Sequence, residues 1–529
     1  MKRILLYCSA LFFAFLSCDS SSEDPTDEGP VQTTDDDISQ PDETAPTISI
    51  SSVPDVIEVL TEFNLQITDE SDQVTTTFSL DGTEIFQSTQ KNFTFELDPY
   101  DFDSGAKTLE VKSTDDSGNE GSTTVSFELR KLLVVYPDPL RESASIRENT
   151  EVYFAINNLE GGLVDFKKIE DDEDVIFFAP DGFDRQDVII TRFMLTNFTN
   201  PSDRIVDVNS YSGIKPGTHL LTEEEEREMF NQPVERDQSA NLIIDTDRIA
   251  RVNSYHGFLS GGIFPNTSNY TLSFASGLDT PFFVKLDSPL GISSLIDYAY
   301  LFIDGFTKTD FTIDDFGPPA ELASLAIPEG DSFNLLLLGY FDESDYESHK
   351  FHIIHFVSGG TPGTSIEIPL LSELNVYAKQ LTLIRPGGKT IFTKQKGADV
   401  PFSIPNIDIT KSGETLNIQG EYDYIDHYLQ TFTAASDVTF AWSFIERPIP
   451  SMTIPFLNNF EFPEAVQSVL NANSVDINPL TVDPVFYRSS VHSFEPSIDY
   501  ENVILTSSFA NNQANNPVDA FVLRLDLKQ

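Results

Sequence analysis

The chain has 529 residues, with 85 Asp and Glu against 32 Lys and Arg, and its formal net charge is −53. Such a charge disfavours polyanionic partners, and because phosphate contacts dominate nucleic-acid affinity, it argues against DNA and RNA binding. Short hydrophobic runs between turn residues, with 43 Phe and one Trp, predict an all-β protein: a β-sandwich followed by a large β-rich region of one or two sandwich-like domains with a few short helices.

The first segment of the chain predicts export. Two basic residues precede an apolar run at residues 4–16 that is too short to span a bilayer, which is typical of a signal peptide at residues 1–17. The run Phe15-Leu16-Ser17-Cys18 resembles a bacterial lipoprotein signal, although that motif usually has Leu where this chain has Phe15. The resemblance implies cleavage before Cys18, a diacylglyceryl thioether on its sulfur, and an acyl chain such as palmitate on its amine. An ordinary signal with a chance cysteine is the alternative.

Residues 18–43 are rich in Asp, Glu, Ser, Thr and Pro, and no Lys or Arg occurs between Arg3 and Lys91. This composition predicts a disordered, self-repelling acidic stalk. An acidic stretch directly after a lipidated cysteine also resembles the surface-export signal of Bacteroidota lipoproteins, which implies a protein anchored in the outer membrane and facing outward. A plain solvated spacer is the alternative. Cys8 leaves with the signal, so Cys18 is the one cysteine left, and no disulfide within a monomer is expected.

Residues 44–131 predict the first folded domain. Asp81-Gly82 marks a tight hairpin, because Gly accepts the positive φ that such a turn needs. Seven short strands in fewer than ninety residues suit an immunoglobulin-like sandwich. The runs at 68–72, 79–82 and 109–119 resemble bacterial Ig-like modules, and the resemblance implies a spacer or binding role. The expected strands are 47–52, 63–67, 74–80, 83–87, 92–97, 107–113 and 123–129.

One end of this sandwich is a candidate calcium site. The loop after the second strand, the loop before the last strand and the incoming N-terminal segment should meet there. Several carboxylates around one hard cation suit Ca²⁺, and ordinary solvated acids are the alternative. The candidate ligands are Asp69, Asp72, Asp115 and Asp116, with Asp42 from the N-terminal segment.

A second unit is expected from residue 140 to residue 529, β-rich throughout, with a candidate subdivision near residue 375. A capping box at Thr222 and Glu225 predicts one short helix. Helical spacing of apolar residues after Pro463 predicts a second, and residues 319–325 suit one further helical turn.

An eleven-residue segment occurs twice, at 203–213 and 247–257, with eight identical positions. No third copy is found, so a propeller is not indicated. The preferred interpretation is two equivalent strand–turn units, either neighbours in one sheet or one in each of two related halves. A ligand site built twice from Asn and Tyr is the alternative.

Three histidines, His349, His352 and His355, lie on an expected strand. Alternation would place His352 on the face opposite the other two, so one metal could not bind all three, and exposed histidines are expected. The run at 385–390 ends like a phosphate-binding loop, but Leu383 stands where the first Gly is required, so a Pro-Gly turn is expected and nucleotide binding is not.

Two acid clusters are candidate hydrolytic sites, with solvated loops as the default. Glycoside hydrolysis needs two carboxylates at a fixed separation, which sequence does not show. Alternation places Trp442 on one face with Phe440 and Phe444, most simply in a core. One cluster is Glu421, Asp423 and Asp426 beside Tyr422, Tyr424 and His427, and the other is Asp342, Glu343, Asp345 and Glu347.

These features favour a non-catalytic surface lipoprotein that binds or presents a glycan or protein ligand. A glycan hydrolase with a carboxylate pair in the C-terminal region is one alternative, and a structural envelope component is another. An exposed aromatic platform in residues 140–529 would favour binding, whereas a deep cleft with paired carboxylates would favour hydrolysis. Expected partners are the membrane, through the lipid, and the ligand; the candidate cofactor is Ca²⁺.

Overall fold

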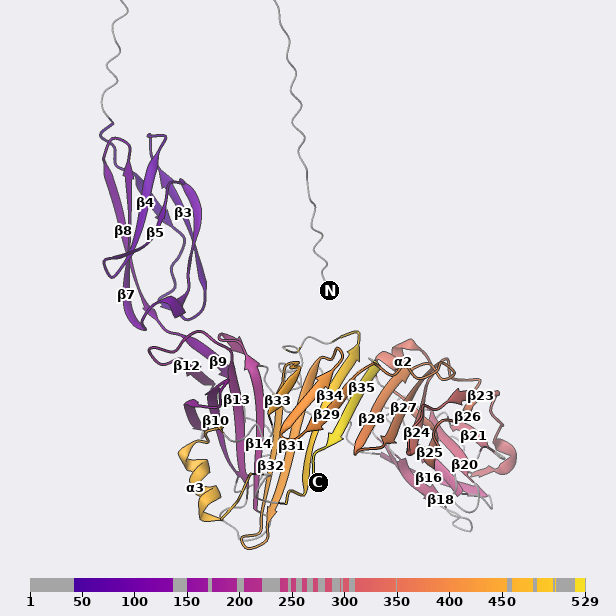
Figure 1. Cartoon of the computed structure of the whole chain (residues 1–529). Coiled ribbons are helices and arrows are strands. Elements are labelled where there is room, and N and C mark those ends of the chain that lie inside the picture. Colours follow the sequence, from indigo (N-terminus) through magenta and orange to yellow (C-terminus); the bar gives the residue numbers. More distant parts are fainter. Residues whose placement is uncertain are drawn as a thin grey trace, which may run out of the picture.

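The structure is a computed structural model of the chain (Figure 1). It describes residues 42–136, 150–169, 174–196, 204–220, 238–245, 249–253, 259–263, 270–274, 281–287, 295, 298–303, 310–348, 350–453, 459–478, 483–497, 500 and 519–528. The expected signal peptide, Cys18 and nearly all of the acidic stalk lie outside these residues. Within them, no helix is long and apolar enough to cross a membrane.

The first domain is the expected Ig-like sandwich of two sheets, ordered β1-β3-β6 and β2-β8-β7-β4-β5. All seven predicted strands are confirmed. The β4–β5 hairpin turns at Asp81 (φ 49°) and Gly82 (φ 82°), as the tight-turn signal predicts. The strands are β1 (Thr47–Ile50), β2 (Val56–Ile57), β3 (Thr61–Thr68), β4 (Val74–Leu80), β5 (Thr83–Ser88), β6 (Asn92–Leu97), β7 (Gly105–Asp115) and β8 (Glu120–Leu129), with a 3₁₀ turn at Pro99–Asp101.

This sandwich packs on aromatic and aliphatic side chains from both sheets. Phe78 is fully buried and its ring centroid lies 4.6 Å from that of Phe95 and 5.5 Å from that of Phe86. At its lower end Tyr100 donates to the Leu132 carbonyl (2.7 Å) and stacks under Arg185, which also pairs with Asp98. These contacts attach the sandwich to the next domain.

The C-terminal region is built on one twelve-stranded sheet (Figure 1). The chain on both sides of residue 375 belongs to it, because β24 pairs with β27. In spatial order its strands are β11 (Leu163–Ile169), β10 (Thr150–Asn158), β13 (Val188–Thr196), β14 (Arg204–Ile214), β32 (Val438–Glu446), β31 (Tyr424–Thr433), β34 (Phe486–Glu495), β35 (Asp519–Asp526), β28 (Lys389–Lys396), β27 (Val376–Arg385), β24 (Ser332–Tyr340) and β25 (His352–Gly360).

Five smaller sheets accompany it. They are β12-β9-β15, β19-β16-β22, β18-β17-β20-β21, β23-β26 and β29-β30-β33. Their strands are β9 (Leu132–Tyr136), β12 (Val175–Phe178), β15 (Thr218–His219), β16 (Gln238–Asp245), β17 (Ile249–Asn253), β18 (Leu259–Ile263), β19 (Tyr270–Phe274), β20 (Phe282–Asp287), β21 (Ala299–Ile303), β22 (Asp310–Thr312), β23 (Glu321–Ala326), β26 (Ser365–Leu370), β29 (Asp408–Ser412), β30 (Thr415–Gln419) and β33 (Ser451–Thr453), with a 3₁₀ turn at Ile313–Asp315.

The two faces of the long sheet differ because side chains alternate along each strand. On what we call the inner face, side chains such as Leu337, Leu429 and Trp442 join a core with residues of β20, β21, β23, β26, β29, β30 and helix α3 (Glu464–Ala472). On the outer face, the β9–β12–β15 sheet covers the strands near β10 and β13. At the other end, Tyr346 of helix α2 (Glu343–Glu347) packs on Tyr340. The strands between these two covered ends carry a half-exposed outer face.

Trp442 lies on the inner face with Phe440 and Phe444, and all three are buried, as alternation predicts. Its indole Nε1 donates to Ser210 Oγ at 2.9 Å. This bond crosses the parallel pairing of β14 with β32, the junction between strands more than 220 residues apart in sequence.

The predicted helix after Pro463 is confirmed, the helical turn predicted at 319–325 is wrong, and a helix at 343–347 was not predicted. α3 (Glu464–Ala472) follows Pro463 and buries Val466 and Leu470. Residues 319–325 form no helical turn, because β23 pairs there with β26 and buries Ala323 and Leu325. The expected helix at Thr222 lies outside the described residues. α2 (Glu343–Glu347) begins where the Asp342 carboxylate caps the Asp345 N–H at 3.0 Å, so this acid cluster forms a capped helix rather than a loop.

The repeated segments occupy strands of two different sheets, β14 in the twelve-stranded sheet and β17 in a four-stranded one. They are therefore not neighbours in one sheet. In the first copy Tyr211 is buried, so it cannot meet a ligand there. The Pro-Gly turn at 386–388 is confirmed as the β27–β28 hairpin, with Gly387 at φ 78°.

The expectation of exposed histidines is wrong for His352 and His355. Both are buried, and both face aromatic rings of the inner core, His352 among Phe283 and Phe302 and His355 beside Tyr298. A register shift in the β24–β25 pairing inserts an extra residue between them. Such a β-bulge reverses the alternation that the sequence argument assumed. His349 lies outside the described residues.

The two histidines predict a specific acid sensitivity. Burial lowers the pKa of His352 to about 3, and burial with the nearby Lys285 lowers that of His355 to about 3, against about 6.5 in an unfolded chain. The unfolded chain therefore binds more protons below pH 6.5, so the stability is complete above pH 6.5 and falls as the pH drops towards 3.

His352→Phe should make the free energy of unfolding depend less steeply on pH between pH 5 and 4, by up to about 1.4 kcal/mol per pH unit. Urea unfolding at a series of pH values measures it. His219→Phe, the same substitution at an exposed histidine, supplies the control. Equal slopes for wild type and His352→Phe would contradict the assignment.

Candidate functional site

The half-exposed middle of the outer face gathers rings, cations and hydroxyls on adjacent strands. Tyr428 lies opposite Arg488 in the β31–β34 pairing, and Ser490 lies opposite Arg524 in the β34–β35 pairing. Val522 of β35, on the same face, lies opposite Phe392 in the β28–β35 pairing. We call this surface the outer strip: Phe392, Asp426, Tyr428, Phe486, Arg488, Ser490, His492 and Arg524.

Two guanidinium groups of the outer strip lie over aromatic rings. The Arg488 Cζ is 4.8 Å from the centroid of the Tyr428 ring, and the Arg524 Cζ is 4.7 Å from that of Phe392. Burial raises the pKa of Tyr428, and Arg488 partly offsets this. Each stack holds a long side chain flat against the sheet, where it keeps a cation at the surface.

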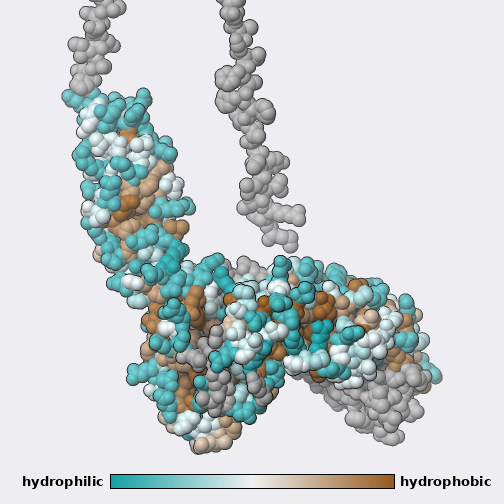
Figure 2. All heavy atoms as spheres, in the orientation of Figure 1, coloured by the Kyte–Doolittle hydropathy of each residue, from teal (hydrophilic) through white to brown (hydrophobic). Residues whose placement is uncertain are grey.

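Large apolar side chains remain exposed along this face. Phe486 precedes Arg488 on β34 and is 49% exposed, as is Phe432 on β31. Ile384 on β27 and Phe356 on β25 are each 45% exposed. Figure 2 shows brown apolar patches among teal residues on the visible side of the C-terminal region and of the first sandwich. Exposed rings beside polar groups make this face a candidate binding surface.

At one end of the outer strip, a carboxylate and an imidazole form a hydrogen-bonded pair. Asp426 hydrogen-bonds to Nε2 of His492, whose ring stacks on Tyr424 with centroids 4.2 Å apart. Burial raises the pKa of Asp426, but His492, His427 and Arg524 outweigh it, and the pKa stays below the usual value. Asp426 is therefore an ionised group held by histidine.

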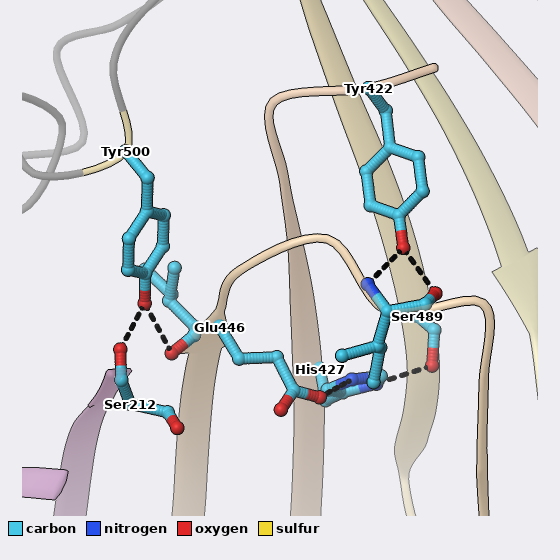
Figure 3. Close-up of polar contacts among 8 residues, drawn as sticks. Ser212, Tyr422, His427, Glu446, Ser489 and Tyr500 are labelled. Carbon is cyan, nitrogen blue, oxygen red and sulfur yellow. Dashed lines mark hydrogen bonds and ion pairs between the residues drawn. The ribbon is translucent and has the colours of Figure 1, made fainter. Parts of the chain in front are cut away.

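The opposite, inner face carries a serine–histidine–glutamate chain (Figure 3). His427 Nδ1 lies 2.7 Å from Ser489 Oγ, and its Nε2 lies 3.2 Å from Glu446 Oε1. An ionised Glu446 can only accept, so Nε2 carries the proton and Ser489 donates to Nδ1. The order matches a nucleophile, base and acid, but Ser489 and His427 are fully buried. A nucleophile must reach its substrate, so this chain serves the core.

Two tyrosines in the same view fasten loops to the sheet (Figure 3). Tyr422 Oη donates to the Ile449 carbonyl at 2.5 Å and accepts from the Ile449 N–H at 2.7 Å. Tyr500 Oη lies 2.6 Å from the Ser212 carbonyl and 3.1 Å from that of Ile445. These residues hold the ends of β14, β31 and β32 together.

The acid–aromatic cluster at 421–427 does not converge on one site. Alternation puts Asp426 on the outer face and His427 on the inner face of β31. Asp423 is buried and accepts from the Phe494 N–H at 2.7 Å, while Glu421 is exposed. The residues that sequence reasoning missed, Arg488 and Arg524, are far apart in sequence and meet only through the β34–β35 pairing.

At the far end of the first sandwich, three aspartates meet. Carboxylate oxygens of Asp42, Asp69 and Asp115 all lie within 4.8 Å of one another. Asp72 and Asp116 are exposed and do not belong to this group. The structure thus brings together two of the four sequence-predicted ligands with Asp42 of the N-terminal segment.

Hydrogen bonds fix these carboxylates. Asn119 donates to both oxygens of Asp115 at 2.8 Å, and together with backbone N–H groups it holds the pKa of Asp115 below its usual value, although burial pushes the pKa up. Ser71 Oγ donates to Asp42 Oδ2 at 2.9 Å. Asp69 Oδ2 is buried and has no hydrogen-bond partner among the described residues. Lys91 donates to the carbonyls of Asp69 and Ser71 rather than to a carboxylate.

No protein-family model matches the chain, and no curated protein matches it. Among solved structures, a Bacteroides ovatus SGBP-B from a mixed-linkage glucan utilization locus, in complex with a mixed-linkage heptasaccharide, is 12% identical over 63% of this chain and 93% of its own, with a TM-score of 0.16. The central fibronectin-III array of RIM-binding protein is 10% identical over 68% and 97%, with a TM-score of 0.11. A tetra-tandem repeat of a large adhesion protein is 13% identical over 67% and 98%, with a TM-score of 0.13. At these TM-scores the similarities say nothing of ligand or activity.

The buried Ser489–His427–Glu446 chain should act on stability alone. Ser489→Ala leaves His427 Nδ1 without its donor in the core, and we expect a loss of about 1–3 kcal/mol in the free energy of unfolding. Urea unfolding measures it. Ser358→Ala, at an exposed site where Oγ donates to Asn334, should change stability by less than about 0.5 kcal/mol. An undiminished stability in Ser489→Ala would show that the chain is not part of the packing.

Proposed function

We propose that this protein is a non-catalytic surface lipoprotein that binds an extended glycan on the outer strip. The observation that carries the proposal is the set of half-exposed rings on one face of the sheet, Phe392, Tyr428 and Phe486, beside guanidinium and hydroxyl groups. The apolar face of a sugar ring packs against an aromatic ring, and its hydroxyls need donors and acceptors nearby.

The shape of this surface favours holding a chain over cutting one. The strip runs across neighbouring strands, so an extended ligand would contact several of them in turn. Hydroxyls of Ser490, Thr382 and Thr390 alternate with the rings on the same face. The hydrolase alternative has weaker support: the Ser489–His427–Glu446 chain is buried, and Asp423 and Asp426 are engaged with backbone and histidine groups.

The proposed display follows from the N-terminal sequence. Lipid on Cys18 would hold the chain at the outer membrane, and the acidic stalk would carry the first sandwich away from it. The sandwich would then act as a spacer, since Tyr100 and Arg185 fasten its lower end to the C-terminal region.

Truncating rings of the outer strip should weaken glycan binding. Tyr428→Ala and Phe486→Ala should each reduce affinity at least about fivefold, which corresponds to about 1 kcal/mol for a central aromatic contact. Affinity electrophoresis in gels with neutral and acidic polysaccharides finds the ligand, and calorimetry measures the loss. Leu322→Ala, at an exposed site on β23, should bind normally. Full affinity in both ring variants, or no polysaccharide bound by the wild type, would overturn the proposal.

We also propose that Asp42, Asp69 and Asp115 bind Ca²⁺ where the stalk enters the first sandwich. Three carboxylates within one ligand shell, one of them with a buried oxygen that lacks a partner, suit a hard divalent cation. Such an ion would tie the incoming residue Asp42 to two loops of the sandwich and stiffen the junction.

Calcium should raise the unfolding temperature of the first sandwich. At about one hundred times the dissociation constant it would contribute about 2.7 kcal/mol, which corresponds to a rise of roughly 10 °C or more for a domain of this size. Calorimetry of the full chain with Ca²⁺ or chelator measures this. Asp69→Asn should abolish the shift, and the matched exposed variant Asp72→Asn should keep it. A wild-type midpoint that is unchanged at millimolar Ca²⁺ rules out the site.

A further inference from the structure

Arg488 and Arg524 are neighbouring cations that form no direct ion pair with a carboxylate among the described residues, although Asp426 interacts electrostatically with Arg524 and Asp526 lies opposite Arg488. They lie on the same face of β34 and β35, diagonally across the Ser490–Arg524 and Arg488–Asp526 pairs. Neither makes a hydrogen bond or an ion pair with any residue in the described part of the chain; their contacts are with the Tyr428 and Phe392 rings. Asp526, opposite Arg488, instead accepts from the Lys528 N–H.

The polar atoms between these cations are also unsatisfied. Nε of Arg488, Nε of Arg524 and Oγ of Ser490 are buried and have no hydrogen-bond partner among the described residues. Ser490 is only 1% exposed. A buried donor without an acceptor costs about 1–3 kcal/mol, so three donors beside one another are a stabilising arrangement only when something accepts from them.

The charges lead to the same conclusion. The protein carries 85 acidic residues against 32 Lys and Arg, yet no carboxylate of the described residues forms an ion pair with these two guanidinium groups. Burial and the neighbouring Arg488 lower the pKa of Arg524, and Asp426 only partly offsets them. The two guanidinium groups are diagonal neighbours across β34 and β35 and repel each other. An oxyanion placed between them would reduce that repulsion and accept charge-assisted hydrogen bonds.

We propose that Arg488, Ser490 and Arg524 form a subsite for a carboxylate or sulfate group carried by a sugar of the bound glycan. This inference rests on the proposed glycan-binding function and narrows it to acidic polysaccharides. The Tyr428 and Phe392 rings beside the cations would take the faces of the sugars, while the fork of each guanidinium takes the oxyanion. The overall negative charge of the protein does not prevent binding of an acidic polysaccharide. Salt screens its long-range repulsion beyond about 8–10 Å, whereas the two guanidinium groups attract the oxyanion at contact distance.

The experiment compares three soluble polymers on the full chain: polygalacturonate, a sulfated galactan and a neutral β-glucan. Wild-type protein should bind one or both acidic polymers at least about tenfold more tightly than the neutral one. Arg488→Gln/Arg524→Gln should lose that preference. Arg524→Lys keeps the positive charge but loses the forked N–H donors of the guanidinium, and this variant should lose part of the preference for acidic polymers. Lys528→Gln, a surface cation beside Asp483, is the matched control and should bind like wild type.

The outcomes separate this subsite from the broader function. Tighter binding of polygalacturonate alone identifies a carboxylate, and tighter binding of the galactan alone identifies a sulfate. A wild type that binds the neutral polymer as well as the acidic ones overturns the subsite but leaves the binding function in place. An acidic preference that survives in the folded double variant, as judged by its thermal midpoint, also overturns the subsite. If no polymer binds, both proposals fail.

Discussion

The parallel pairing of β14 with β32 is the contact on which the C-terminal region depends. It joins the strands of residues 150–214 to those of residues 332–526 in one twelve-stranded sheet. Pairing across such a sequence distance carries a large loop-closure cost, so packing must supply the stability. Trp442 does so at the centre: it is buried, its indole donates to Ser210, and Thr191 Oγ1 lies 2.9 Å from the same hydroxyl. Three strands are thus joined at one point in the core.

This junction also fixes which face is available outside. Once Trp442 and Ser210 face inward, alternation sends Asp426, Tyr428, Arg488 and Arg524 outward on the strands that follow. The inner face is closed by small sheets and α3, and among the described residues the outer face is covered at its two ends. A one-residue slip would exchange the faces, so the core that stabilises the sheet also specifies the outer strip.

Local signals predicted local structure well. Alternation and turn residues located the first sandwich, the Asp81-Gly82 hairpin, the turn at 386–388 and the inward position of Trp442, because each depends on neighbours in sequence. Helical spacing located α3 for the same reason. The turn expected at 319–325 failed because pairing of β23 with a distant strand overrode local preference. The prediction that His355 is exposed was wrong because a β-bulge, which leaves no sequence signal, shifted the alternation of side chains along β25.

The two candidate sites, the aspartate group of the first sandwich and the outer strip, also differ in how far sequence could locate them. Loop positions in an Ig-like sandwich are known in advance, so Asp69 and Asp115 could be placed together from sequence, although Asp72 and Asp116 could not be excluded. The outer strip could not be found, since Arg488 and Arg524 become neighbours only when β34 and β35 pair. In a chain with so many carboxylates, proximity of acids carries little information. Two neighbouring arginines that form no direct ion pair with any carboxylate in the described part of the chain are the informative exception.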